Sequence, residues 1–200
     1  MKSHRYLLSA VLLSLSTLAF AQSDAQKPGA QMSDAHKSMD EPAPSEAQKS
    51  FDTMKSFAGD WEGPVAVPEM PEMSDGKPLH VSLRVTSRGH VIVHEMQEAN
   101  TLLDATKYDH PVTMLYVNDD QLNLVHYCDA GNRPHMNGKM SPDGKTVEFT
   151  LVDVSGSTKP GYMQHAVFTY IDANHHTEDW TFMMPGDKAM HAHFDLQRTK

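Results

Sequence analysis

The chain contains one cysteine, Cys128, among its 200 residues. A single thiol cannot form an intramolecular disulfide, so the fold must depend on its hydrophobic core. Cationic residues are also scarce: 17 lysines and arginines stand against 26 aspartates and glutamates. The net charge of −9 becomes −11 once residues 1–21, which hold two cations and no acidic residue, are set aside. This charge argues against binding nucleic acid or docking on anionic lipid, since both need a basic surface.

Long apolar runs are absent after residue 21, which argues against a helix that spans a membrane. The apolar run at residues 6–18 is shorter than the roughly 20 residues that a membrane span needs. It follows the cations Lys2 and Arg5 and precedes Ala19 and Ala21, small residues at the two positions that a signal peptidase reads. This order predicts a secretory signal peptide over residues 1–21, cleaved after Ala21. We therefore expect a periplasmic or extracellular protein.

Residues 22–50 contain no aromatic residue and no leucine, isoleucine or valine. Such a segment buries too little apolar area to offset the entropy that it loses on ordering, so it is predicted to be a disordered spacer. A short helix near residues 45–54 is compatible with Ser45, which can cap a helix N-terminus. The remaining residues, 51–200, have the length of one compact domain.

Helical periodicity is nearly absent from residues 51–200, where apolar and polar residues alternate instead. Turn residues such as Pro142 and Gly144 separate the alternating segments. The pattern predicts an all-β fold, an up-and-down antiparallel β-barrel of about nine or ten strands, or a sandwich. A closed barrel is favoured because it leaves no unpaired edge. Its interior would hold packed side chains or one small ligand. The expected strands cover residues 57–67, 79–86, 90–98, 112–117, 121–128, 145–152, 163–171, 175–184 and 189–198.

Gly59 and Trp61 near the start of this domain, with Arg198 near its end, resemble the structural signature of lipocalins and the wider calycin group. The resemblance implies that the tryptophan closes the barrel floor and that the arginine lies across its ring. A guanidinium placed in this way gains cation–π energy while its protons reach backbone carbonyls.

A second resemblance rests on residues 112–116 and 124–136, which contain His-Tyr-Cys followed by Gly-Asn-Arg-Pro-His-Met. These runs resemble a bacterial family of exported, lipocalin-like proteins of unknown function. Members of that family also carry a glutamate after an apolar strand, here Glu95. Arg133 and His135 stand where the family has glutamine and arginine. The resemblance implies a fold and no established activity.

Alternation within the expected strands places several polar side chains inside the barrel. His126 and Cys128 share a face with Leu122 and Leu124. The same parity turns His165 inward on the strand at residues 163–171. An apolar cavity with a few polar groups is the ordinary form of a small-molecule site. The predicted lining is His126, Cys128, His165, Glu178 and Trp180, with Glu95 and Asn132 near the rim.

Each of these residues also has a structural interpretation. A buried histidine is commonly a core residue with one hydrogen-bond partner, and a free cysteine is commonly a small buried hydrophobe. Asn132 lies in a turn composition in which asparagine tolerates a left-handed backbone. Cys128 would be reactive only if a nearby cation, for which Arg133 is the candidate, lowered its pKa.

Metal binding is a further alternative because the chain has 13 histidines. His191 and His193 are two residues apart on one strand face and could hold Zn²⁺ or Cu²⁺. However, the apolar residues between them belong to the core face, so these two histidines are expected outside. Some small ten-stranded barrels that resemble nitrobindins hold haem through one histidine, and the sequence does not mark such a histidine here. We therefore predict no dedicated metal site, and the sequence leaves the cofactor unknown.

Three functional hypotheses remain from the sequence. The first is a non-enzymatic barrel that binds a small, largely apolar molecule. The second is an enzyme that uses the region of His126, Cys128 and Glu178. The third is a structural or envelope-stress protein whose barrel is packed solid.

Overall fold

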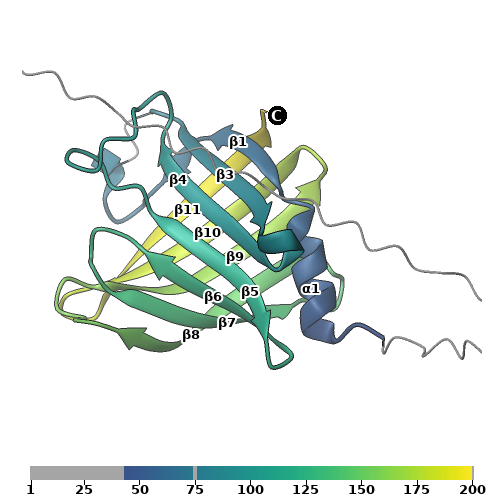
Figure 1. Ribbon diagram of the computed structural model, residues 1–200. Helices are drawn as coiled ribbons and strands as arrows, with labels where there is room; N and C mark the ends of the chain where they lie inside the picture. The colour runs from purple at the N-terminus through teal and green to yellow at the C-terminus, as the bar shows by residue number, and fades with distance from the viewer. Residues whose placement is uncertain (1–42, 74–75, 200) are drawn as a thin grey trace, which may run out of the picture. The chain divides into compact units, whose positions relative to one another are not determined.

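The computed structural model describes residues 43–73 and 76–199. The predicted signal peptide and residues 22–42 of the predicted spacer lie outside the described residues. The described part is a sheet of eleven strands with one α-helix (Figure 1), so the predicted all-β class is confirmed. The strands are β1 (Gly59–Gly63), β2 (Val65–Ala66), β3 (Leu79–Thr86), β4 (Val91–Glu98), β5 (Val112–Asn118), β6 (Gln121–Tyr127), β7 (Arg133–Met140), β8 (Thr146–Ser155), β9 (Tyr162–Asp172), β10 (His175–Met184) and β11 (Lys188–Arg198).

The sheet closes on itself. From β3 to β11 each strand pairs with the next in sequence, and β1 pairs with both β3 and β11. All strands except β2 therefore form a closed antiparallel barrel of ten strands, which confirms the predicted architecture. The short strand β2 pairs with β11 through Val65 and Ala66. Closure removes the unpaired edges that an open sheet would present.

Short turns join most neighbouring strands because the turn residues accept unusual backbone conformations. Asp119 and Asp120, between β5 and β6, have φ values of 48° and 56°. Positive φ at both central residues is the geometry of a type I′ hairpin turn, whose twist matches that of the flanking strands. The connections β4–β5 (residues 99–111), β6–β7 (128–132), β8–β9 (156–161) and β10–β11 (185–187) lie together at one end of the barrel, which we call the loop end.

Helix α1 (Glu46–Lys55) covers the opposite end, beside β5, β6 and β7. Ser45 caps it, as the sequence indicated, by accepting a hydrogen bond from the backbone N–H of Gln48 at 3.2 Å. Phe51 and Met54 are fully buried in the barrel core. The helix begins five residues before the domain start expected at Phe51. None of the described helices is long and apolar enough to cross a membrane.

Trp61 and Arg198 form the closure that the calycin resemblance implied. The indole of Trp61 is buried, and its Nε1 donates to the carbonyl of Phe57 at 2.8 Å. The guanidinium carbon of Arg198 lies 4.0 Å from the centre of that ring. The same guanidinium donates to the backbone carbonyls of Ser56, Ala58 and Ala173. Gly59 opens β1 with a φ of 142°, a conformation that favours glycine.

Candidate functional site

A row of polar side chains crosses three neighbouring strands on the inside of the barrel. His94 on β4 pairs in register with Thr113 on β5, which pairs with His126 on β6. All three side chains are fully buried. Thr113 Oγ1 and His126 Nδ1 are hydrogen bonded at 2.8 Å. The predicted inward orientation of His126 is therefore confirmed.

Glu178 on β10 is a buried carboxylate that accepts three hydrogen bonds. Its donors are Nε2 of His94 at 3.0 Å, Nε2 of His176 at 3.0 Å and Nε1 of Trp180 at 2.9 Å. Burial alone would raise the pKa of Glu178, but the electrostatic attraction of His94 and the hydrogen bonds from His176 and His94 outweigh it. The pKa is therefore held well below its usual range, and Glu178 is ionised. An ionised carboxylate only accepts, so both histidines carry a proton on Nε2.

Three ring nitrogens in this cluster have no hydrogen-bond partner among the described residues. They are Nδ1 of His94, Nδ1 of His176 and Nε2 of His126, all buried. The imidazole rings of His94 and His126 lie against the indole of Trp180, with centroid distances of 5.7 Å and 5.5 Å. Burial, and to a smaller extent His94, lowers the pKa of His126 to about 3, so this ring is neutral at pH 7. The cluster thus presents unused hydrogen-bonding capacity inside an otherwise apolar core.

A partly exposed apolar row lies beyond this cluster toward the loop end. Phe182 follows Trp180 by two residues on β10, so the two share a face. Phe182 pairs in register with Met163 on β9 and with Met190 on β11. All three side chains are partly exposed. Methionine is flexible and adapts to irregular apolar shapes, so this row can contact apolar molecules of different shapes.

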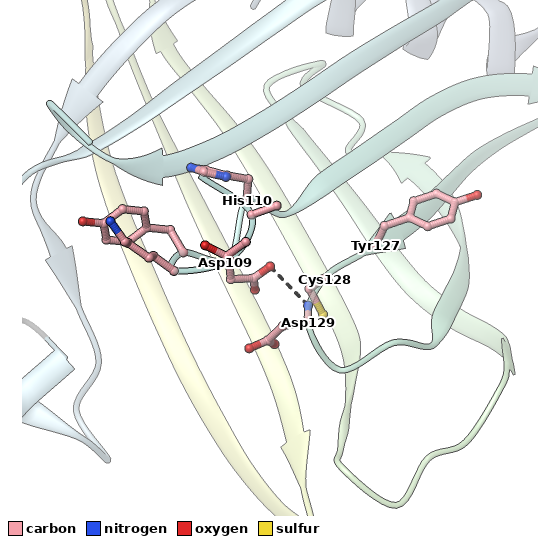
Figure 2. Close-up of a pocket in the computed structure, with 9 residues that line it drawn as sticks. Asp109, His110, Tyr127, Cys128 and Asp129 are labelled. Carbon is pink, nitrogen blue, oxygen red and sulfur yellow. Dashed lines mark hydrogen bonds between the residues drawn. The ribbon is translucent and has the colours of Figure 1, made fainter. Parts of the chain in front are cut away.

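Cys128 lies just past the end of β6 and lines a surface cavity of about 480 Å³ at the loop end (Figure 2). Donor atoms of Asp109, Cys128 and Asp129 lie within 4.8 Å of one another. Asp109 Oδ1 accepts the backbone N–H of Asp129 at 3.1 Å, which joins residues 99–111 to the β6–β7 turn. Tyr127 points away from the two carboxylates in this view.

The environment of Cys128 does not activate its thiol. Burial, reinforced by the charges of Asp109 and Asp129, raises the pKa of Cys128. A nucleophilic or metal-binding cysteine needs the thiolate, which these surroundings disfavour. Burial and the charge of Asp129 likewise raise the pKa of Asp109. His126 is hydrogen bonded to Thr113, and no hydrogen bond joins it to Cys128 in the described part of the chain.

Glu95 lies on the outer side of β4 near the loop end. Its side chain is exposed and lines a second cavity of about 200 Å³, together with His80, Leu103 and His110. His110 lines both surface cavities, and its Nε2 is buried without a partner. Glu95 therefore stands near the rim as predicted, on the opposite face of the sheet from the neighbouring His94.

Asn132 is buried and links two loops at the loop end. Its Nδ2 donates to the carbonyls of Ser157 at 2.9 Å and Gly161 at 2.7 Å. The left-handed backbone position of this turn belongs to Gly131, whose φ is 70°, and not to Asn132 as expected. The side chain of Asn132 therefore contributes through tertiary hydrogen bonds, which its place in a turn composition did not reveal.

The inward orientation expected for His165 is wrong. Its Nε2 lies 2.8 Å from Oε1 of Glu148 on the outer face of the barrel. The reason is a β-bulge, because adjacent residues Thr181 and Phe182 on β10 pair with His165 and Met163 on β9. Gln164 is the extra residue of this bulge. Because of it, His165 and Met163 lie on opposite faces of the sheet, whereas strict alternation would place them on the same face. His191 and His193 are exposed on the outer face, as expected.

Glu178 and Trp180 face the interior as predicted, but His94, Thr113 and His176 were not among the predicted site residues. The signal for His94 was weak because both faces of β4 carry apolar residues. Val93 is buried like Ile92, so alternation did not separate the two faces of this strand. The alternation on β10 did place His176 with Glu178 and Trp180.

Comparison with known proteins supports the fold. No protein-family model and no curated protein sequence matches the chain. It is similar in structure to Rv2717c from M. tuberculosis, with a TM-score of 0.52 and 15% sequence identity over 76% of this chain and 98% of that one. A protein of unknown function from the DUF3598 family of Nostoc punctiforme gives a TM-score of 0.42 at 6% identity, over 73% of this chain and 49% of that one. At this identity the likeness to Rv2717c concerns the barrel fold alone.

Proposed function

We propose that this protein is exported and binds a small, largely apolar molecule inside its barrel. The observation that carries the proposal is the pair of buried ring nitrogens without partners, His94 Nδ1 and His126 Nε2, beside Trp180. Each unsatisfied buried polar group costs about 1–3 kcal/mol. A core that served only stability would place apolar side chains at these positions. A ligand that meets these nitrogens removes the cost.

The apolar character of the ligand follows from the residues between the cluster and the loop end. Met163, Phe182 and Met190 form the partly exposed apolar row described above. At the other end α1 and Trp61 are packed into the core. We therefore expect the ligand to enter from the loop end, with its polar group toward His126 and its apolar body against the row.

The two other hypotheses have less support. An enzyme that used Cys128 would need a thiol with a lowered pKa, and the pKa of Cys128 is raised. A solid structural barrel would leave the unpartnered imidazole nitrogens without a role.

The test measures thermal stability and ligand occupancy on the same samples. We expect native mass spectrometry of the protein, purified from its own host, to show a bound small molecule. His126→Gln should fold nearly normally and lose most of that molecule, because the shorter amide cannot reach the same position. His165→Gln is the matched control, since His165 lies on the outer face beside Glu148.

A protein that carries no small molecule in any preparation contradicts the proposal. So does a His126→Gln variant that is less stable but retains the molecule in proportion to the folded protein. That second result would make His126 a core residue only.

A further inference from the structure

We infer that the polar group of the bound molecule is an uncharged hydroxyl, so that the ligand class is an apolar alcohol and not a fatty acid. This inference rests on the proposed function. It concerns the chemistry at His94 and His126 and follows from the hydrogen-bonding capacity and the charge of the buried cluster.

The hydrogen-bonding capacity requires a group that both donates and accepts. His126 is neutral, so one of its ring nitrogens carries a proton and the other a lone pair. Its Nδ1 is engaged with the hydroxyl of Thr113, which can play either role. His126 Nε2 is therefore a donor or an acceptor according to the direction of that bond. A hydroxyl satisfies both cases, whereas a carboxylate can only accept.

The free nitrogen of His94 also favours a hydroxyl as the polar group of the ligand. Its Nε2 donates to Glu178, so its free Nδ1 is a lone pair in the neutral ring and an N–H in the charged ring. A hydroxyl can again serve either state. Both rings lie against the same indole, so a hydroxyl that meets either nitrogen lies beside Trp180.

The charge of the cluster disfavours an anion. The buried polar side chains of the described residues include Glu178 and no lysine or arginine. Glu178 accepts hydrogen bonds from both His94 and His176. With only one of these two rings charged, the cluster is already neutral, and with neither charged it carries the charge of Glu178. In both of these states an anionic group loses its hydration without a cation of its own. Only a cluster with both rings charged would hold a cation for a ligand carboxylate.

The experiment compares octan-1-ol with octanoate, which have the same chain and differ in the head group. Binding to the protein purified after export is measured by calorimetry at neutral pH. We expect octan-1-ol to bind at least about tenfold more tightly than octanoate. Glu178→Gln should narrow this difference by strengthening the binding of octanoate. Glu148→Gln, on the outer face, is the control and should leave the difference unchanged.

The outcomes separate the two proposals. Equal or tighter binding of octanoate overturns the hydroxyl inference and leaves a ligand-binding barrel in place. A folded Glu178→Gln variant with unchanged binding of octanoate overturns the charge argument. If that variant does not fold, the comparison on the unmodified protein decides alone. Absence of binding by both compounds, together with the absence of any co-purified molecule, overturns the proposed function itself.

Discussion

At the scale of single residues, the contact between Trp61 and Arg198 gives a quantitative expectation. Trp61→Ala should lower the free energy of unfolding by about 3–5 kcal/mol, because it removes a buried indole. Arg198→Ala should cost less. The two losses should be non-additive by about 0.5–3 kcal/mol, because the guanidinium lies over the ring. Chemical denaturation of both single variants and the double variant measures this coupling.

Arg84→Ala is the control for Arg198→Ala, since Arg84 is exposed on β3 and should change stability by no more than about 0.5 kcal/mol. Strictly additive losses for Trp61→Ala and Arg198→Ala would show that the two side chains close the barrel independently.

His126 contributes to the dependence of stability on pH. Its folded-state pKa of about 3 lies below the ordinary value of 6.5. Between these values the unfolded chain binds a proton that the folded chain does not, so stability is full above about pH 6.5 and falls with acidification. Glu178 adds to the loss only below its ordinary pKa of 4.5. Chemical denaturation at several pH values between about pH 7 and pH 4.5 measures this effect. The free energy of unfolding should fall less steeply with acidification for His126→Gln than for the unmodified protein.

His165→Gln serves as the control and should keep the slope of the unmodified protein. If His126→Gln were as sensitive to acid as the unmodified protein, the ring would not be neutral in the folded state.

At the scale of elements, β7 is the strand that the sequence pattern did not mark. It contains Pro134, Asn137 and Gly138 and has no β-branched residue, so intrinsic propensity disfavours a strand there. It forms because β6 and β8 pair with it on both sides. Packing requires a glycine at position 138, because a Cβ there would lie 2.5 Å from Cε1 of Phe149 and 2.8 Å from Cδ2 of Leu122.

Gly138→Ala should therefore lower the free energy of unfolding by about 1–3 kcal/mol through overpacking. Lys139→Ala, at the neighbouring exposed position, should change it by no more than about 0.5 kcal/mol. Chemical denaturation of the two variants provides the comparison. A Gly138→Ala variant as stable as the unmodified protein would mean that Phe149 and Leu122 move aside freely.

Alternation was sufficient to predict the barrel and the inward side chains of His126, Glu178 and Trp180. These residues lie on strands with regular register between their apolar neighbours and the site. It failed at His165, since the bulge at Gln164 depends on the pairing of β9 with β10. It also failed at His94, because both faces of β4 are apolar near that residue. Bulges and two-sided burial arise from tertiary contacts, which a single-strand pattern does not contain.

At the scale of the whole molecule, the prediction concerns export. Mass spectrometry and N-terminal sequencing of the exported protein should find Gln22 as the first residue, because Ala19 and Ala21 supply the small residues that the peptidase reads. Ala21→Lys should block cleavage, whereas Ala25→Lys, beyond the cleavage position, should not. An exported protein that retains Met1 contradicts the predicted signal peptide.

The joint between β1 and β11 also sets the order in which the chain can assemble. It consists of two residue pairs, Trp61 with Arg198 and Glu62 with Gln197. From β3 to β11 the strands pair with their neighbours in sequence, so most of the sheet can grow as successive hairpins. Closing β1 onto β11 requires a much larger loop and should be a late event in folding. A ribosome must therefore complete nearly the whole chain before the open edges of the sheet are covered, so the growing chain presents unpaired strand edges until synthesis is almost finished.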